Sequence, residues 1–151
     1  TGLALAGSNT TEQTTTATTV VSIVTMAVTS IAAGTPILIV INWRKSAGAA
    51  AAVTIGLTLN APQVNSGQTA SNTTDQAESG TAVFVLGARE ASYLRAMSGL
   101  GVTAAGALNT WRALADTPTA AITTVIIRGY TDNALVTLAI KDVRVYTLPT
   151  S

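Results

Sequence analysis

The stretch Val53-Thr54-Ile55-Gly56-Leu57-Thr58-Leu59-Asn60 decides the fold class, because apolar residues occupy every second position along it. Alternate side chains of a β-strand point to opposite faces, so this spacing gives one apolar face and one face of small and polar residues. We predict a strand with Thr54, Thr58 and Asn60 toward solvent. The residues predicted to be buried are Val53, Ile55, Leu57 and Leu59.

Two further strands precede this stretch. Residues 20–31 and 37–44 are rich in β-branched side chains, which favour strands, and Gly34-Thr35-Pro36 forms a turn between them. The second of these segments has Ile37, Ile39, Ile41 and Trp43 on one face and Leu38 and Val40 on the other. A strand that is apolar on both faces is typical of the interior of a sandwich or of a covered interface.

The C-terminal half contains three more predicted strands, at residues 81–86, 122–130 and 134–148. Thr131-Asp132-Asn133 is a cluster of turn-forming residues of the kind that joins a hairpin. In the last strand the apolar positions change phase at Lys141-Asp142. This change predicts a β-bulge or a switch between faces.

Three segments lack a clear strand pattern. Residues 1–19 are polar and Thr-rich, and we expect an extended arm that becomes ordered only against a neighbouring subunit. Residues 63–80 are almost entirely polar and predict a long exposed loop. In residues 87–116, Tyr93, Leu94 and Met97 have helical spacing while Gly99 and Gly101 interrupt it, so we expect one short helix followed by irregular chain or a strand.

These segments together predict an all-β fold. We expect a jelly-roll-like β-sandwich with an extended N-terminal arm and at most one short helix. The domain organisation expected is an arm at residues 1–19 and a single β-sandwich domain at residues 20–151.

The composition is typical of a subunit that is packed against other chains. Only 10% of the 151 residues are charged and the net charge is +1, whereas a soluble domain has about 25% charged residues. A net charge near zero favours association. We therefore expect a homo-oligomer, with a trimer favoured.

Several function classes are disfavoured by what the chain lacks. It has no His, which is the commonest general base and metal ligand, and no Cys. Its eight cations are scattered, which argues against nucleic-acid binding. Residues 13–43 are uncharged, but the stretch contains many Thr residues and is broken by Gly34-Thr35-Pro36. The apolar runs that remain, residues 20–31 and 37–43, are too short for a transmembrane helix. We expect no cofactor, no nucleic-acid partner and no membrane partner.

A few residues are candidates for chemical sites. Asp75 and Glu78 could form an acid pair, but a solvated loop is the simpler interpretation. Asp132 and Asn133 could bind calcium, yet they supply too few oxygen ligands, which favours a turn. Lys45 and Lys141 could act as bases, although for Lys45 we expect an ordinary surface role. We therefore predict no catalytic, cofactor-binding or metal-binding residues, and no enzyme activity.

Aromatic residues offer one binding alternative, since exposed rings can stack on sugars. Aromatics make up 4% of the chain, and we expect most of them to serve the core. The five considered are Trp43, Tyr93, Trp111, Tyr130 and Tyr146. Asn9-Thr10-Thr11 and Asn72-Thr73-Thr74 also fit the pattern for N-glycosylation, which matters only in a secreted eukaryotic protein.

The C-terminal third carries a family resemblance. Ile122-Thr123-Thr124-Val125-Ile126-Ile127-Arg128-Gly129 followed by Ile140-Lys141-Asp142-Val143-Arg144-Val145-Tyr146 resembles the closing strand pair of jelly-roll and β-sandwich domains in phage decoration, fibre and tail proteins. The resemblance implies a virion structural protein, foremost a capsid decoration (cement) protein on the particle surface that contacts its own copies and a capsid protein. The alternatives are the fibre or receptor-binding head of a phage and a carbohydrate-binding β-sandwich module.

Overall fold

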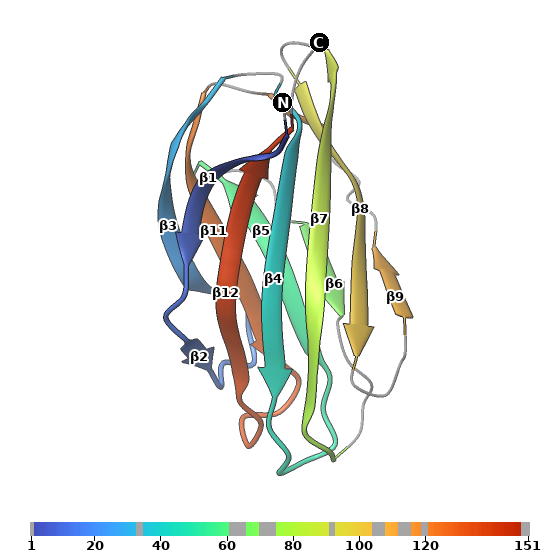
Figure 1. The fold of residues 1–151 in the computed structure, drawn as a ribbon. Coiled ribbons are helices and arrows are strands. Elements are labelled where there is room, and N and C mark those ends of the chain that lie inside the picture. Colours follow the sequence, from blue (N-terminus) through green and yellow to red (C-terminus); the bar gives the residue numbers. More distant parts are fainter. Residues whose placement is uncertain are drawn as a thin grey trace.

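The computed structural model describes the backbone of residues 2–32, 35–60, 66–69, 75–90, 93–103, 108–111, 116–118 and 121–148. Within these ranges the regular elements are all β-strands, and they form two antiparallel sheets that face each other (Figure 1). The structure is therefore an all-β sandwich, as the alternating sequence patterns predicted. The finer expectation of a jelly roll stays a prediction.

The larger sheet has eight strands, of which six form its main path. In order these are β1 (Ala4–Asn9), β12 (Leu138–Thr147), β4 (Ile37–Lys45), β7 (Glu78–Glu90), β8 (Tyr93–Thr103) and β10 (Asp116–Pro118). Two short strands complete it, because β2 (Gln13–Thr15) pairs with β12 and β9 (Leu108–Trp111) pairs with β8. We call it the large sheet.

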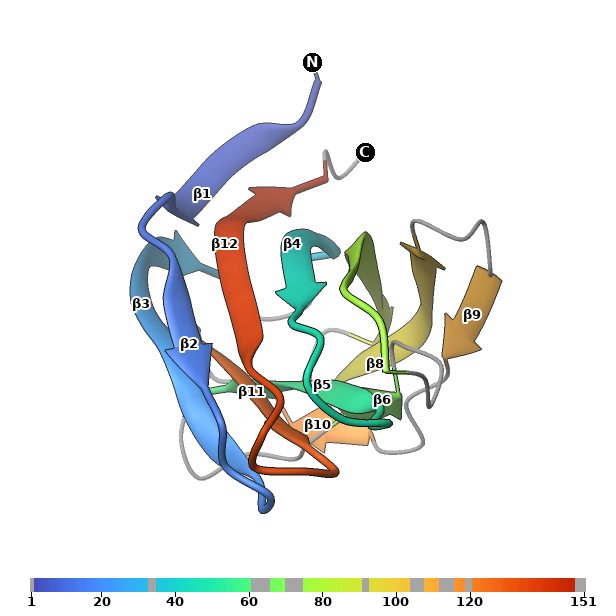
Figure 2. The ribbon, with the colours of Figure 1, turned by 90° about the horizontal axis from the view of Figure 1, so that it is seen from below.

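The second sheet has four strands, and we call it the small sheet. Its order is β3 (Val21–Ile31), β11 (Ile122–Thr131), β5 (Val53–Leu59) and β6 (Ser66–Thr69). A view along the strands shows the small sheet on one side and β12, β4 and β7 on the other (Figure 2). The apolar core fills the space between the two sheets.

The apolar face of β5 is buried in this core, as predicted from its alternation. Val53, Ile55, Leu57 and Leu59 all belong to the core. The polar face departs from the prediction at Thr58, which is only 2% exposed, while Thr54 and Asn60 are half-buried. Thr58 stands directly opposite Ile126 of β11, and cross-strand partners contact each other on the same face of a sheet.

The predicted β-bulge in the last strand is present. Asp142 has a positive φ of 54°, and Asp142 and Val143 of β12 together stand opposite the one residue Ile41 of β4. The extra residue restores the phase, so that Val143 and Val145 are buried in the same core as Leu138 and Ile140.

The N-terminal segment differs from the expectation that only a neighbouring subunit would order it, and that expectation was wrong. β1 pairs with residues 143–147 of β12, and β2 pairs with residues 138–140. The free edge of β12 offers unpaired backbone groups, and an added strand can pair with them through its main chain with little demand on its side chains. The proposed division of the chain between residues 19 and 20 stays a prediction.

Three other local expectations were wrong. The predicted loop at residues 63–80 contains β6 and the start of β7. Tyr93, Leu94 and Met97 lie in β8 rather than in a helix, because glycines disfavour a helix and β7 supplies a long pairing partner. The turn after Thr131 does not join a hairpin, since β11 and β12 belong to different sheets.

No helix in the described ranges has the length and apolar character needed to cross a membrane.

Gly129 of β11 occupies a position where a side chain does not fit. A Cβ atom there would lie 2.5 Å from the carbonyl oxygen of Thr54 and 3.0 Å from Cδ2 of Leu138. The oxygen belongs to the backbone of β5 and cannot rotate away, so we expect Gly129→Ala to lower the free energy of unfolding by about 1–3 kcal/mol. Urea denaturation measures the change. Gly2→Ala is the control, since a Cβ at Gly2 has nothing within 4 Å, and equal midpoints for the two variants would contradict the prediction.

Candidate functional site

The candidate site is the face of the large sheet that points away from the core. Along β4, Ile37, Ile39, Ile41, Trp43 and Lys45 are buried, so the intervening residues face outward. Strand register then identifies their neighbours, because directly opposed residues share a face. We call this surface the outer face. Its central residues are Leu38, Val40, Asn42 and Arg44 of β4, Thr81, Val83 and Val85 of β7, and Lys141, Arg144 and Tyr146 of β12.

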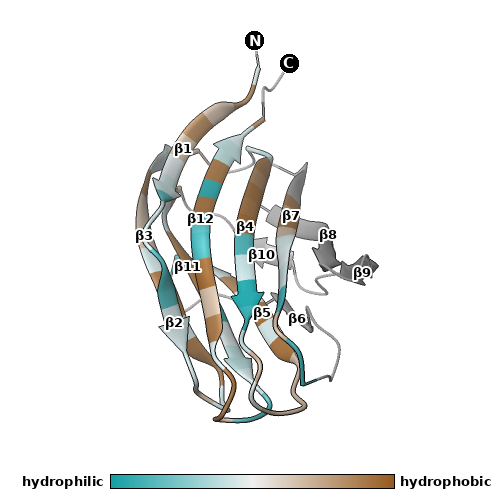
Figure 3. Ribbon diagram, turned by 60° about the horizontal axis from the view of Figure 1, so that its bottom comes forward, coloured by the Kyte–Doolittle hydropathy of each residue, from teal (hydrophilic) through white to brown (hydrophobic). Residues whose placement is uncertain are grey.

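One half of the outer face is apolar. Leu38 lies between Tyr146 and Val85, and the next row of β4 and β7 pairs Val40 with Val83. All five side chains are only half-buried in the single chain. Leu5 of β1, which is 54% exposed, extends the first row as the partner of Tyr146. The hydropathy colouring shows β4 changing from apolar at its start to polar at its end (Figure 3).

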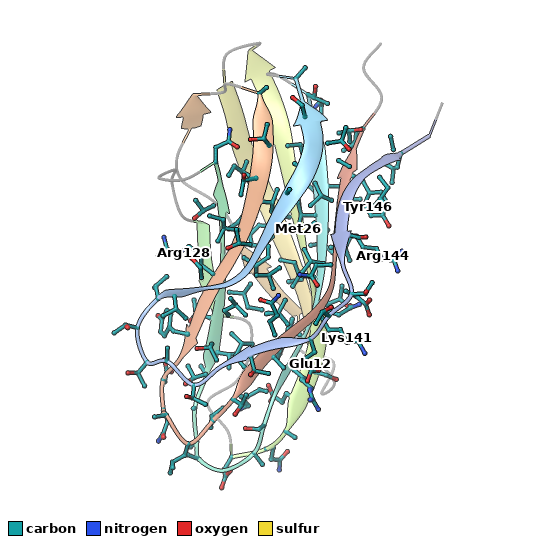
Figure 4. The ribbon with its side chains drawn as sticks, turned by 90° about the vertical axis from the view of Figure 1, so that its left-hand side faces the viewer. Glu12, Met26, Arg128, Lys141, Arg144 and Tyr146 are labelled. Atoms are coloured by element: carbon teal, nitrogen blue, oxygen red, sulfur yellow. The ribbon has the colours of Figure 1, made fainter. Side chains whose placement is uncertain are left out.

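The other half of the outer face is polar and carries cations. Arg44 and Lys141 are exposed there, and Arg44 Nη2 donates to Glu12 Oε1 at 2.6 Å. Arg144 is also exposed and borders the apolar half, opposite Val40. Lys141, Arg144 and Tyr146 lie along β12 on one side of the molecule, with Glu12 nearby (Figure 4). Next to them the hydroxyl of Thr81 donates to Oδ1 of Asn42 at 2.8 Å.

A hollow of about 610 Å³ opens at the polar end of this face. Ala139 contributes only a methyl group to the hollow. Strand register places Thr14, Arg44 and Ser79 in one row with Ala139, and these three residues also line the hollow. The hollow therefore offers hydroxyl and guanidinium donors, with a buried carboxylate, Glu78, also in its lining.

Lys45 is not a surface residue, so the expectation of an ordinary surface role was wrong. Its side chain is 1% exposed, and Nζ donates to the carbonyl oxygen of Ala51 at 2.8 Å. The cause is the alternation of side chains along a strand, because Lys45 follows Ile37, Ile39, Ile41 and Trp43 at every second position of β4 and therefore faces inward. Glu78 stands opposite it at the start of β7 and is also buried.

The two residues of the candidate acid pair, Asp75 and Glu78, have different environments. Glu78 belongs to a strand and is buried, so the solvated-loop interpretation was wrong for it. Asp75 is exposed, and its Oδ1 accepts a hydrogen bond from the backbone N–H of Gly48 at 2.8 Å. Asp75 thus has the loop role that was expected.

Asp132 and Asn133 form a turn, as predicted. The backbone N–H of Leu135 donates to Oδ1 of Asn133 at 2.9 Å, and the N–H of Val136 donates to the carbonyl oxygen of Asn133 at 3.0 Å. Asp132 Oδ2 accepts from Ala52 N–H at 3.4 Å. Across the part of the chain that the structure describes, no three His, Cys, Asp or Glu residues come together as a possible metal site.

The aromatic residues do not gather into one platform among the described side chains. Trp43 is in the core. Tyr130 of β11 and Tyr146 of β12 are half-buried and belong to different sheets. The side chains of Tyr93 and Trp111 lie outside the described residues, as does the Asn72-Thr73-Thr74 tripeptide. In the other tripeptide, Oδ1 of Asn9 accepts from the backbone N–H of Thr11.

Comparison with known proteins gives structural likenesses alone. No family model matches the sequence, and no curated protein matches it. A structure of infectious bursal disease virus Gt strain is similar with a TM-score of 0.46 and 9% identity, over 97% of this chain and 32% of that chain. A structure of the Gx strain has a TM-score of 0.36 and 9% identity, over 99% and 36%. The chain thus spans about a third of the length of these viral chains.

Proposed function

We propose that this chain is a virion structural protein, and specifically a capsid decoration (cement) protein on the particle surface. It binds its own copies, with a trimer favoured, and a capsid protein, and its role is structural rather than catalytic. The observation that carries the proposal is the apolar half of the outer face. In the single chain the side chains of Leu38, Val40, Val83, Val85 and Tyr146 remain partly open to solvent.

An apolar sheet face of this kind gains free energy when another protein covers it. Burial contributes about 25 cal/mol per Å² before the opposing costs of association are counted. The low charge of the chain supports the same role, because burying few ions avoids a large desolvation penalty. A particle subunit uses both properties, since most of its stability comes from contacts with neighbours.

The location of the chain tests this proposal directly. Particles are purified by density gradient from the biological source of the sequence, and antibodies against the chain are used for blotting and for gold labelling. We expect the chain in the particle fraction, with label over the whole shell. Label confined to one vertex or to a tail would favour a fibre or receptor-binding head. A chain found only outside particles, and binding glycans as a monomer, would favour a carbohydrate-binding module and overturn the proposal.

Substitution in the apolar half gives a second prediction. We expect Val40→Asp to fold but to bind particles at least about tenfold more weakly, because it introduces a charge that must be desolvated on contact. Val40→Thr keeps the shape and strand preference and should weaken binding less. Thr25→Asp, on an exposed position of β3 in the small sheet, is the matched control. Equal binding of Val40→Asp and wild type, in a pelleting assay, would show that the outer face is not the contact.

A further inference from the structure

The outer face concentrates positive charge. It carries Arg44, Lys141 and Arg144, against the carboxylates of Glu12 and of the bulge residue Asp142. Even with both acids counted, the excess of one positive charge equals the net +1 of the entire chain. The other charged residues of the chain sum to zero, so the described part of this face carries a positive excess.

Two of these cations are available to a partner. Arg44 already has Glu12 as its ion-pair partner. Within the described residues, Lys141 and Arg144 have no acid at ion-pair distance, and both are exposed. They lie on the same strand on either side of the bulge, and Arg144 stands directly opposite Val40 in the apolar half.

This arrangement has the form of a protein interface. An apolar centre made by β4 and β7 is bordered along β12 by cations, and interfaces commonly combine an apolar core with a polar rim. The rim charges select the partner, since complementary potentials increase the rate and specificity of association. A two-fold contact between copies through this face would place like charges together, which disfavours a second copy as the occupant.

We propose that the outer face of the large sheet docks on an acidic protein surface of the particle, with carboxylates of that surface opposite Lys141 and Arg144. This inference rests on the proposed function and adds the chemistry of the partner. Contacts between copies of the chain then use other surfaces, so that one subunit holds the capsid protein and its neighbours at the same time.

The test uses particles assembled without this chain, to which the purified full chain is added back. We expect the double variant Lys141→Gln and Arg144→Gln to bind about tenfold more weakly than wild type, with a smaller loss of affinity as salt is raised. The double variant Thr25→Glu and Thr29→Glu is the matched control, because it changes the net charge equally on exposed positions of β3. It should bind like wild type.

The outcomes separate the inference from the proposed function. If the double variant at Lys141 and Arg144 binds as tightly as wild type while Val40→Asp does not bind, the contact is real but the partner is not acidic. If both bind like wild type, the outer face is not the contact and the proposed function loses its support as well. If the double variant instead lowers the mass of the chain alone in light scattering, the occupant is a second copy and the inference is overturned.

Discussion

Leu57→Ala is expected to lower the free energy of unfolding by about 2–5 kcal/mol, the range for large-to-small changes in a packed core. Leu57 is 2% exposed and belongs to the core between the two sheets. It pairs with Ile127 of β11 and Ser66 of β6, so a strand lies on each side of it. The truncation removes apolar contacts and leaves a cavity that neighbouring strands cannot close without losing register. Urea denaturation with a two-state analysis measures the loss.

Leu135→Ala is the matched control for this change. Leu135 is 72% exposed in the turn before β12, so the same atoms are removed where they contribute little to the core. We expect a change within about 0.5 kcal/mol. If the two Leu→Ala variants shifted the midpoint by the same amount, the assignment of the buried face of β5 would be wrong.

The sequence predicted the strands best where local pattern and sheet position agree. In β5 the alternation of apolar and polar residues matches one buried face, and the structure buries that face. The bulge at Lys141-Asp142 could also be predicted, because one extra residue in a strand shifts the alternation of apolar and polar residues by one position. In both cases the information is local and depends on the period of two.

Pairing between distant strands could not be read in the same way. The spacing of Tyr93, Leu94 and Met97 is compatible with a helix, but β7 supplies a long antiparallel partner and β8 forms instead. The polar segment at residues 1–19 has no core of its own, yet it completes the edge beside β12. These outcomes depend on which backbone groups remain unpaired after the other strands assemble. The sequence pattern within one segment does not contain that information.

The candidate site was only partly visible in the sequence. The apolar character of both faces of residues 37–44 pointed to a covered surface, and Leu38 and Val40 indeed face outward. The alignment of Val83, Val85 and Tyr146 beside them comes from strand register. The same signal was present at residues 81–86, where small or apolar residues also occupy both faces, and it could have identified the second strand of the surface.

Two adjacent residues of β4 test whether the alternation of side chains along the strand determines which one is buried. Arg44 and Lys45 are both cations, but Arg44 faces solvent while Lys45 is 1% exposed and donates to the carbonyl oxygen of Ala51. We expect Lys45→Ala to cost about 3–5 kcal/mol, because it removes the donor from a buried carbonyl and an ammonium from the position opposite the buried Glu78.

Lys45→Met and Arg44→Ala complete the comparison. Met keeps the length of the apolar stem without the charge, so Lys45→Met should cost less than Lys45→Ala while still leaving the carbonyl of Ala51 without its donor. Arg44→Ala removes only an exposed ion pair with Glu12 and should cost at most about 1 kcal/mol. Unfolding free energies from urea titration give the ranking. If Arg44→Ala lowered the free energy of unfolding as much as Lys45→Ala, the inward orientation of Lys45 would be wrong, because the two neighbours differ in the face of the strand to which they point.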